Sequence, residues 1–203
     1  MNTAVAGPQR LAPPPGVLDV RRGTIAMELF ILTEAMLFLM LFFTYFYLGH
    51  AAAKWPTDVP RLRLALPMLA ILVSSSVVLY WGERGEKKGQ IGRARLGVIV
   101  TVIMGAAFVT LQVFEYLDRA RTILPTSDAY GSIFFTITSL HGAHVVLGLL
   151  MLGYVLIMPT EHWGPSSKPP HHVLHNVGLY WHFVDTVWVF IVALLYVMPN
   201  LRS

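Results

Sequence analysis

The chain has no cysteine in its 203 residues, and this absence excludes disulfide bonds, Cys-ligated zinc and iron–sulfur clusters. Charged side chains are scarce as well: Asp, Glu, Lys and Arg make up 13% of the residues, against roughly 25% in soluble domains. Hydrophobic residues make up 55%. The net charge of +4 is weak evidence for nucleic acid, because basic residues in so apolar a chain usually mark cytoplasmic loops. The composition indicates an integral membrane protein with no nucleic-acid partner.

The N-terminal segment also lacks something, because no apolar stretch of signal-peptide length precedes Arg21 and Arg22. Proline, alanine and glycine are frequent there instead. We therefore expect residues 1–22 to form a flexible tail on the cytoplasmic face. Residues 23–203 should form one transmembrane domain.

Five apolar runs are long enough to cross a hydrocarbon core, which takes about 20 helical residues. They cover residues 25–48, 64–81, 96–117, 131–157 and 177–198. The predicted fold is therefore all-α, an integral membrane bundle of five transmembrane helices. Nine of the 15 Lys and Arg residues fall on the side of the N-terminal tail and six on the other. Because basic residues concentrate on the cytoplasmic side, we expect the N-terminus inside and the C-terminus outside.

Six ionisable residues lie within these spans, away from their very ends. They are Glu34, Glu115, His141, His144, His182 and Asp185. A charged group inside a bilayer costs about 3 kcal/mol, so each should face the bundle interior. They could be structural and hydrogen-bonded there, or form a proton path, a metal or haem site, or a lipid pocket. Glu34 lies at a depth similar to that of Asp185, so it could hydrogen-bond to His182 or Asp185.

The histidines do not form a convincing haem or metal site. His141 and His144 are three residues apart on one helix, so they share a face and cannot be opposite axial ligands. His144 and His182 differ in depth by roughly 10 Å, at about 1.5 Å per residue. The neighbouring Gly142 and Gly148 indicate close helix packing around hydrogen-bonded imidazoles rather than a metal centre. We expect this chain to bind no metal or haem.

Basic and imidazole side chains near the membrane interfaces are candidates for binding lipid headgroups. They are Arg61, Arg63, His171, His172 and His175. The aromatic run "FFTYFY" at 42–47 should line the acyl tails of a structural phospholipid.

Several segments resemble subunit III of the haem–copper oxidases, in the short five-helix form of that family. The resemblance is carried by "ELFILTEAMLFLMLFFTYFY" (28–47), "SDAYGSIFFTITSLHGAHVVLG" (127–148) and "YWHFVDTVWVF" (180–190). "ILVSSSVVLY" (71–80) and "LQVFEYLDR" (111–119) fit the same pattern, so the resemblance extends from about residue 22 to the end. The family carries a Glu seven residues before the motif histidine in many members, whereas this chain has His175 there.

The resemblance implies an accessory, non-catalytic subunit without a redox centre, in a bacterial inner membrane. Its partners would be the catalytic subunit I, which carries haem and copper, the other oxidase subunits and membrane lipids. The implied role is to stabilise that subunit, support proton uptake from the inner face and protect against inactivation during turnover. Glu34 matches the carboxylate of the family that reacts with carbodiimide. The other five buried residues match motif positions with structural or lipid-related roles.

Other hypotheses remain open from the sequence alone. A close one is subunit III of a quinol oxidase or of a complex associated with nitric oxide reductase. A proton-coupled transporter would use Glu34 and Glu115 as relay groups, but no inverted repeat or broken helix pair supports it. A membrane cytochrome b is disfavoured by the mismatch in histidine depth.

Overall fold

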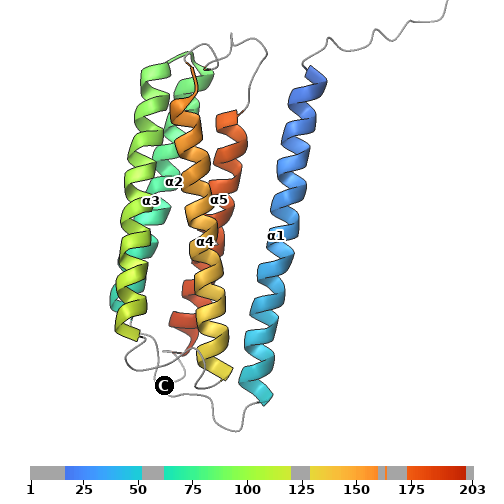
Figure 1. The fold of residues 1–203 in the computed structure, drawn as a ribbon, viewed down its shortest axis with the longest axis vertical. Coiled ribbons are helices and arrows are strands. Elements are labelled where there is room, and N and C mark those ends of the chain that lie inside the picture. Colours follow the sequence, from blue (N-terminus) through green and yellow to red (C-terminus); the bar gives the residue numbers. More distant parts are fainter. Residues whose placement is uncertain (1–16, 52–61, 120–128, 160–162, 164–172, 200–203) are drawn as a thin grey trace, which may run out of the picture.

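The computed structural model describes residues 17–51, 62–119, 129–159, 163 and 173–199, and all regular structure in these ranges is helical. The elements are α1 (Val17–Ala51), α2 (Leu62–Lys87), α3 (Ile91–Arg119), α4 (Ala129–Ile157), α5 (Val173–Ile191) and the π-helix η2 (Val192–Val197), which continues α5. The five long helices run alternately up and down, so the start of α1 and the end of η2 lie at opposite ends (Figure 1). All five are long and apolar enough to cross a membrane, which confirms the five predicted spans.

The turn between α2 and α3 is much shorter than the sequence suggested. We expected a polar loop over residues 82–95, yet α2 continues to Lys87 and α3 starts at Ile91. Gly89 ends α2 in the left-handed conformation, at φ 73°. Its N–H donates to Glu86 O and that of Gln90 donates to Gly85 O, the hydrogen-bond pattern of a Schellman cap. The two helices therefore form a tight hairpin.

Glycine lets the α2–α3 hairpin close. A Cβ on Gly97 of α3 would lie 2.8 Å from the Cα of Gly82 in α2. The two helix backbones therefore approach so closely that neither position has room for a side chain, as at many helix crossings in membranes. Near the turn, the Arg93 guanidinium lies 4.4 Å above the Trp81 ring and fixes the same end of the hairpin.

Trp181 of α5 fills the centre of the bundle and is fully buried. Its indole N–H donates to Ser75 Oγ in α2 at 2.9 Å. A Cβ on Gly105 of α3 or Gly148 of α4 would lie 2.6 Å and 2.8 Å from its ring atoms, respectively. One aromatic side chain thus joins four helices, and two glycines provide its space.

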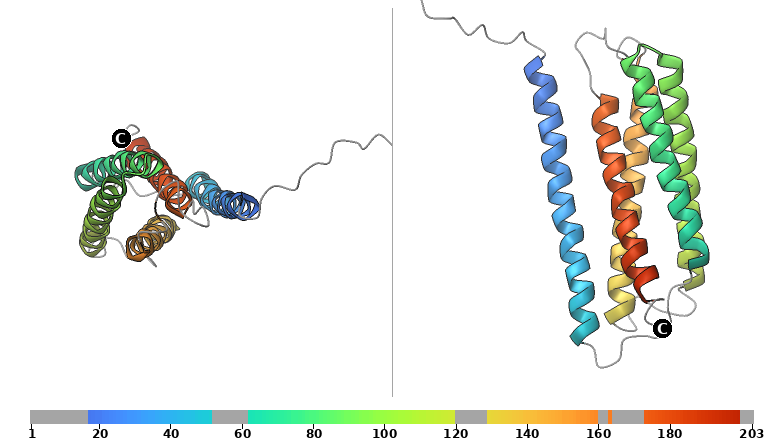
Figure 2. Two further views of the ribbon diagram at one scale, coloured as in Figure 1. Left: turned by 90° about the horizontal axis from the view of Figure 1, so that it is seen from above. Right: turned by 180° about the vertical axis from the view of Figure 1, so that it is seen from behind.

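Helix α1 is the least enclosed element. Only 11% of its most apolar window is buried, against 56% for the helix formed by α5 and η2. It stands at one side of the bundle and contacts α4 and α5 (Figure 2). Large apolar side chains, including Phe43 and Leu39, therefore remain on its outer surface.

Candidate functional site

Glu34 of α1 is paired with His144 of α4. Its Oε2 lies 2.9 Å from His144 Nε2, and both side chains are largely buried. The edge of the Phe38 ring packs against the imidazole at 5.1 Å between ring centroids. Tyr180 of α5 donates its hydroxyl hydrogen to the His144 carbonyl oxygen at 3.2 Å. The Glu34–His144 pair joins α1, the least enclosed helix, to the rest of the bundle.

The geometry fixes how this pair shares its protons. His144 Nδ1 lies 2.7 Å from the Leu140 carbonyl oxygen, which can only accept, so Nδ1 carries a hydrogen. Nε2 then either donates to a Glu34 carboxylate or accepts from a protonated Glu34. The pair has no net charge in either arrangement, which suits a low-dielectric environment.

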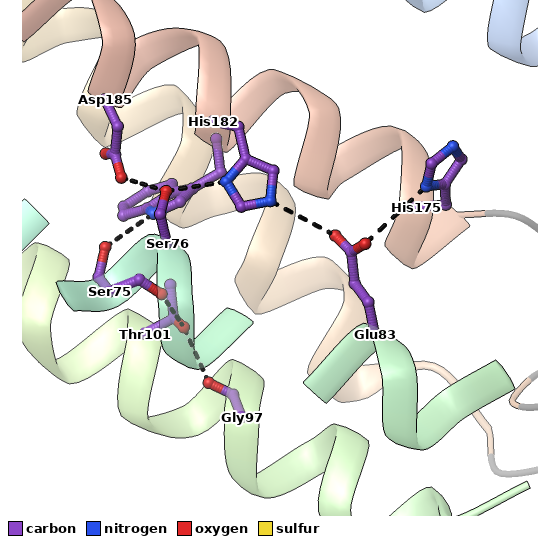
Figure 3. A network of polar contacts seen from close by, with 9 residues as sticks. Ser75, Ser76, Glu83, Gly97, Thr101, His175, His182 and Asp185 are labelled. Carbon is purple, nitrogen blue, oxygen red and sulfur yellow. Dashed lines mark hydrogen bonds and ion pairs between the residues drawn. The ribbon is translucent and has the colours of Figure 1, made fainter. Parts of the chain in front are cut away.

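The depth argument allowed Glu34 to meet His182 or Asp185, but those two residues are bound elsewhere. The Ser76 hydroxyl of α2 donates to Asp185 Oδ2, and Ser76 Oγ lies 2.8 Å from His182 Nδ1 (Figure 3). Because the one Ser76 hydrogen points to Asp185, His182 Nδ1 is the donor to Ser76. Glu34 and Asp185 therefore pair with different helices, Glu34 with α4 and Asp185 with α2.

Glu83 of α2 extends this network toward the inner end predicted for the bundle. Its two carboxylate oxygens lie 3.9 Å from His175 Nδ1 and 4.0 Å from His182 Nε2, so the acid sits between the two imidazoles (Figure 3). The carboxylate occupies the space that a side chain would take at Gly178 of α5. Glu83 is 6% exposed, which makes it a buried acid rather than the loop residue that we expected.

Glu115 lies at the other end of the bundle. It accepts a hydrogen bond from the Tyr196 hydroxyl at 2.9 Å, and Arg119 Nε lies 3.7 Å from the same carboxylate oxygen. Tyr196 belongs to η2, where the wider π-turn changes the register of the last residues of the helix. This cluster therefore ties the end of α3 to the end of the last helix.

His141 differs from the hydrogen-bonded imidazole that the sequence suggested. It is fully buried, yet neither ring nitrogen has a hydrogen-bond partner within the described residues. Its ring stacks on Trp188 with centroids 4.9 Å apart and meets the edges of Phe38 and Phe108. Aromatic packing holds this histidine in place of polar contacts.

Within the described part of the chain, no three His, Asp or Glu side chains are grouped as a metal ion would require. His144 and His182, the histidines weighed as haem ligands, bond to different helices. Of the residues expected to meet lipid, Arg61, His171 and His172 lie outside the described ranges. Arg63 is exposed at the start of α2, whereas His175 is part of α5 beside Glu83.

Sequence reasoning missed Ser76, Glu83, Gly178 and Tyr196. A signal for Glu83 was available, because the buried positions Leu72, Ser75 and Leu79 continue to it at steps of three and four. The charged residues after Glu83 hid this helical period. No comparable signal marked Tyr196, since a π-turn changes the register without a sequence signature.

The site consists of acids and imidazoles that pair across the helices of a membrane bundle. The fold and the site together define a multi-pass membrane protein with internal polar contacts. A family profile described as cytochrome c oxidase subunit III matches residues 17–199. The chain belongs to this family and is a subunit III of the haem–copper oxidases.

Individual relatives agree with the profile. The chain is 30% identical over 178 residues to cytochrome c oxidase subunit 3 of Thermostichus vulcanus, covering 87% of each chain. It is 32% identical over 173 residues to the Synechocystis sp. protein of the same name, covering 84% of this chain and 73% of that one. For the Paracentrotus lividus protein, also named cytochrome c oxidase subunit 3, identity is 34% over 179 residues, covering 84% and 67%.

Proposed function

We propose that this chain is a non-redox accessory subunit that packs against the haem- and copper-bearing catalytic subunit I of an oxidase in a bacterial inner membrane. The relatives' names favour a complex that takes its electrons from cytochrome c. The chain stabilises the catalytic subunit and supports its proton uptake from the inner face. O₂ reduction itself takes place on the partner.

The observation that carries this proposal is the pairing of the buried acids. Glu34, Glu115 and Asp185 each have a side-chain partner on another helix. Polar groups used in this way fix helix positions, which is the work of a supporting subunit. They would give the catalytic partner a bundle of fixed shape to rest on.

Affinity purification from native membranes tests the proposal. A tagged form of the chain should bring down a partner with a haem Soret band and copper, whereas the isolated chain should show neither haem nor copper. Oxidase depleted of the chain should begin at a near-normal rate and lose activity after fewer turnovers. A Soret band in the isolated chain, or no haem-containing partner, would contradict the proposal.

The proposed accessory role includes a structural phospholipid. An apolar groove of about 640 Å³ lies between α1 and the α5–η2 helix, with Phe42, Phe43 and Phe46 of the "FFTYFY" run along it. Its opposite wall includes Phe190 and Leu194. Acyl chains fit such a surface, and Arg63 stands at the outer end predicted for the bundle, where a headgroup would be. Delipidated complex should lose thermal stability, and adding phospholipid should restore it.

A further inference from the structure

One face of the bundle differs in chemistry from the rest of its outer surface. We call it the α2/α5 seam, defined by Tyr80 and Arg84 of α2 and by His175 and His182 of α5. The two imidazole side chains are each 35% exposed, and Tyr80 is 48% exposed. The Arg84 guanidinium lies 4.6 Å above the Tyr80 ring. The seam therefore presents hydrogen-bonding and cationic groups outward.

The outer face of α3 provides the contrast. Its exposed large hydrophobic side chains are Leu96, Ile99, Ile103, Val113, Phe114 and Leu117, and its exposed polar side chains are Thr110 and, at the last turn, Asp118. This is the surface expected against acyl chains, where polar groups are costly. The two faces are thus built for different neighbours.

Depth excludes lipid headgroups from the inner part of the seam. His182 is nine residues after Val173, about 14 Å along the helix axis. If α5 and η2 are centred in a hydrocarbon core of roughly 30 Å, the imidazole lies on the order of 10 Å inside it. A histidine side chain is too short to reach the headgroups from there. Its neighbour must be a polar group carried into the membrane by another helix.

Contacts within the bundle also position part of the seam. Glu83 lies beneath it between the two imidazoles, in the space left by Gly178, and Ser76 holds His182 from the other side (Figure 3). The hydrogen bond to Ser76 therefore positions His182 before any neighbour arrives. Pre-positioned side chains lose little conformational entropy on binding, which suits a permanent interface.

We propose that the α2/α5 seam is the surface on which a transmembrane helix of the catalytic subunit docks, with a hydroxyl or amide side chain facing His182 and Arg84. The inference rests on the proposed function and adds to it the face of contact. The seam offers the Arg84 guanidinium as a donor and, because His182 Nδ1 donates to Ser76, the His182 Nε2 as an acceptor, so a partner group that both donates and accepts complements it. The apolar face of α3 then remains for lipid.

Photo-cross-linking in native membranes tests this assignment. Replacing Tyr80 by p-benzoylphenylalanine puts the probe on the seam with little change of shape, and replacing Phe114, which is 61% exposed on α3, is the matched control. We expect irradiation to join the Tyr80 probe to the haem-containing partner and the Phe114 probe to lipid alone. Adducts of the Tyr80 probe with lipid, or with a second copy of this chain, would overturn the proposal.

Substitution gives an independent measurement. His182→Leu should lower the amount of haem partner retained with the tagged chain several-fold, whereas His50→Leu, at an exposed position on α1, should not change it. Equal retention in both variants would overturn the docking assignment and leave the accessory role intact. If the unaltered tagged chain retains no haem partner, the accessory role and the docking assignment both fail.

Discussion

Glu34 and His144 show at the residue scale how a membrane protein keeps an acid and a base in a medium that does not solvate ions. Their side chains meet at 2.9 Å, and the second ring nitrogen is already bonded to the Leu140 carbonyl. The pair can hold its shared proton on either partner without creating net charge. The Glu34 carboxyl can therefore react with an apolar carboxyl reagent although it is largely buried.

We predict that carbodiimide modifies Glu34 more readily than Glu115, because the reagent attacks protonated carboxyls in apolar surroundings and Glu115 is held by Arg119. Glu34→Gln should abolish this labelling, assemble nearly normally and reduce oxidase turnover at most partially, since the amide can still hydrogen-bond to His144. Mass spectrometry of labelled peptides and O₂ consumption measure both effects. Glu28→Gln, at an exposed position on the same helix, is the control. Complete loss of O₂ reduction in assembled Glu34→Gln complex would show that this residue is essential.

A second prediction concerns the space at Gly178. Gly178→Ala puts a methyl group where the Glu83 carboxylate lies, so the acid must move and the complex should lose about 1–3 kcal/mol of stability. Thermal unfolding in detergent measures the loss. Gly153→Ala is the matched control, since nothing lies within 4 Å of the added atom. In the double variant with Glu83→Ala the steric penalty should disappear, and a penalty that persists would mean that the carboxylate is not its cause.

At the scale of elements, the α2–α3 hairpin depends on backbone contact more than on side chains. The Cβ that Gly97→Ala adds would lie 2.8 Å from the Gly82 backbone, which cannot turn aside as a side chain can. We predict a loss of stability larger than that of Gly178→Ala, measured by the same thermal unfolding. Gly92→Ala, on the same helix with open space around it, should have no cost. Equal melting temperatures for Gly97→Ala and Gly92→Ala would refute the close approach of the two backbones.

The sequence predicted the number and location of the helices well, and its one clear error, the end of α2, has an identifiable cause. Run length and hydropathy identified all five spans, because crossing a bilayer requires about 20 apolar residues. The end of α2 was missed because charge after Trp81 resembles a loop, although the helix continues to Lys87. The hydrogen-bond partners of the buried acids could not be predicted from the sequence. Depth suggested that Glu34 lies near Asp185, but the rotation of each helix about its axis decides that His144 is the neighbour of Glu34.

On the scale of the whole molecule, an odd number of crossings places the start of α1 and the end of η2 on opposite sides of the membrane. The distribution of basic residues predicts that α1 starts on the cytoplasmic side. The natural chain has no cysteine, so single substitutions give unique labels. We predict that an impermeant maleimide reaches Lys88→Cys, in the α2–α3 turn, only from the cytoplasmic side and Ser203→Cys only from the other. Labelling of both from one side would refute the topology.

The place of α1 in the bundle also has a consequence for biosynthesis. This helix is made before the other four, yet it contacts mainly α4 and α5, and His144 is made 110 residues after Glu34. At about 5–20 residues per second, the nascent α1 waits roughly 5–20 s for its partner. During that interval the translocon or a membrane insertase must shelter the unpaired carboxyl. Cells short of insertase should therefore lose this chain early, through proteolysis of a nascent segment whose partner has not yet been translated.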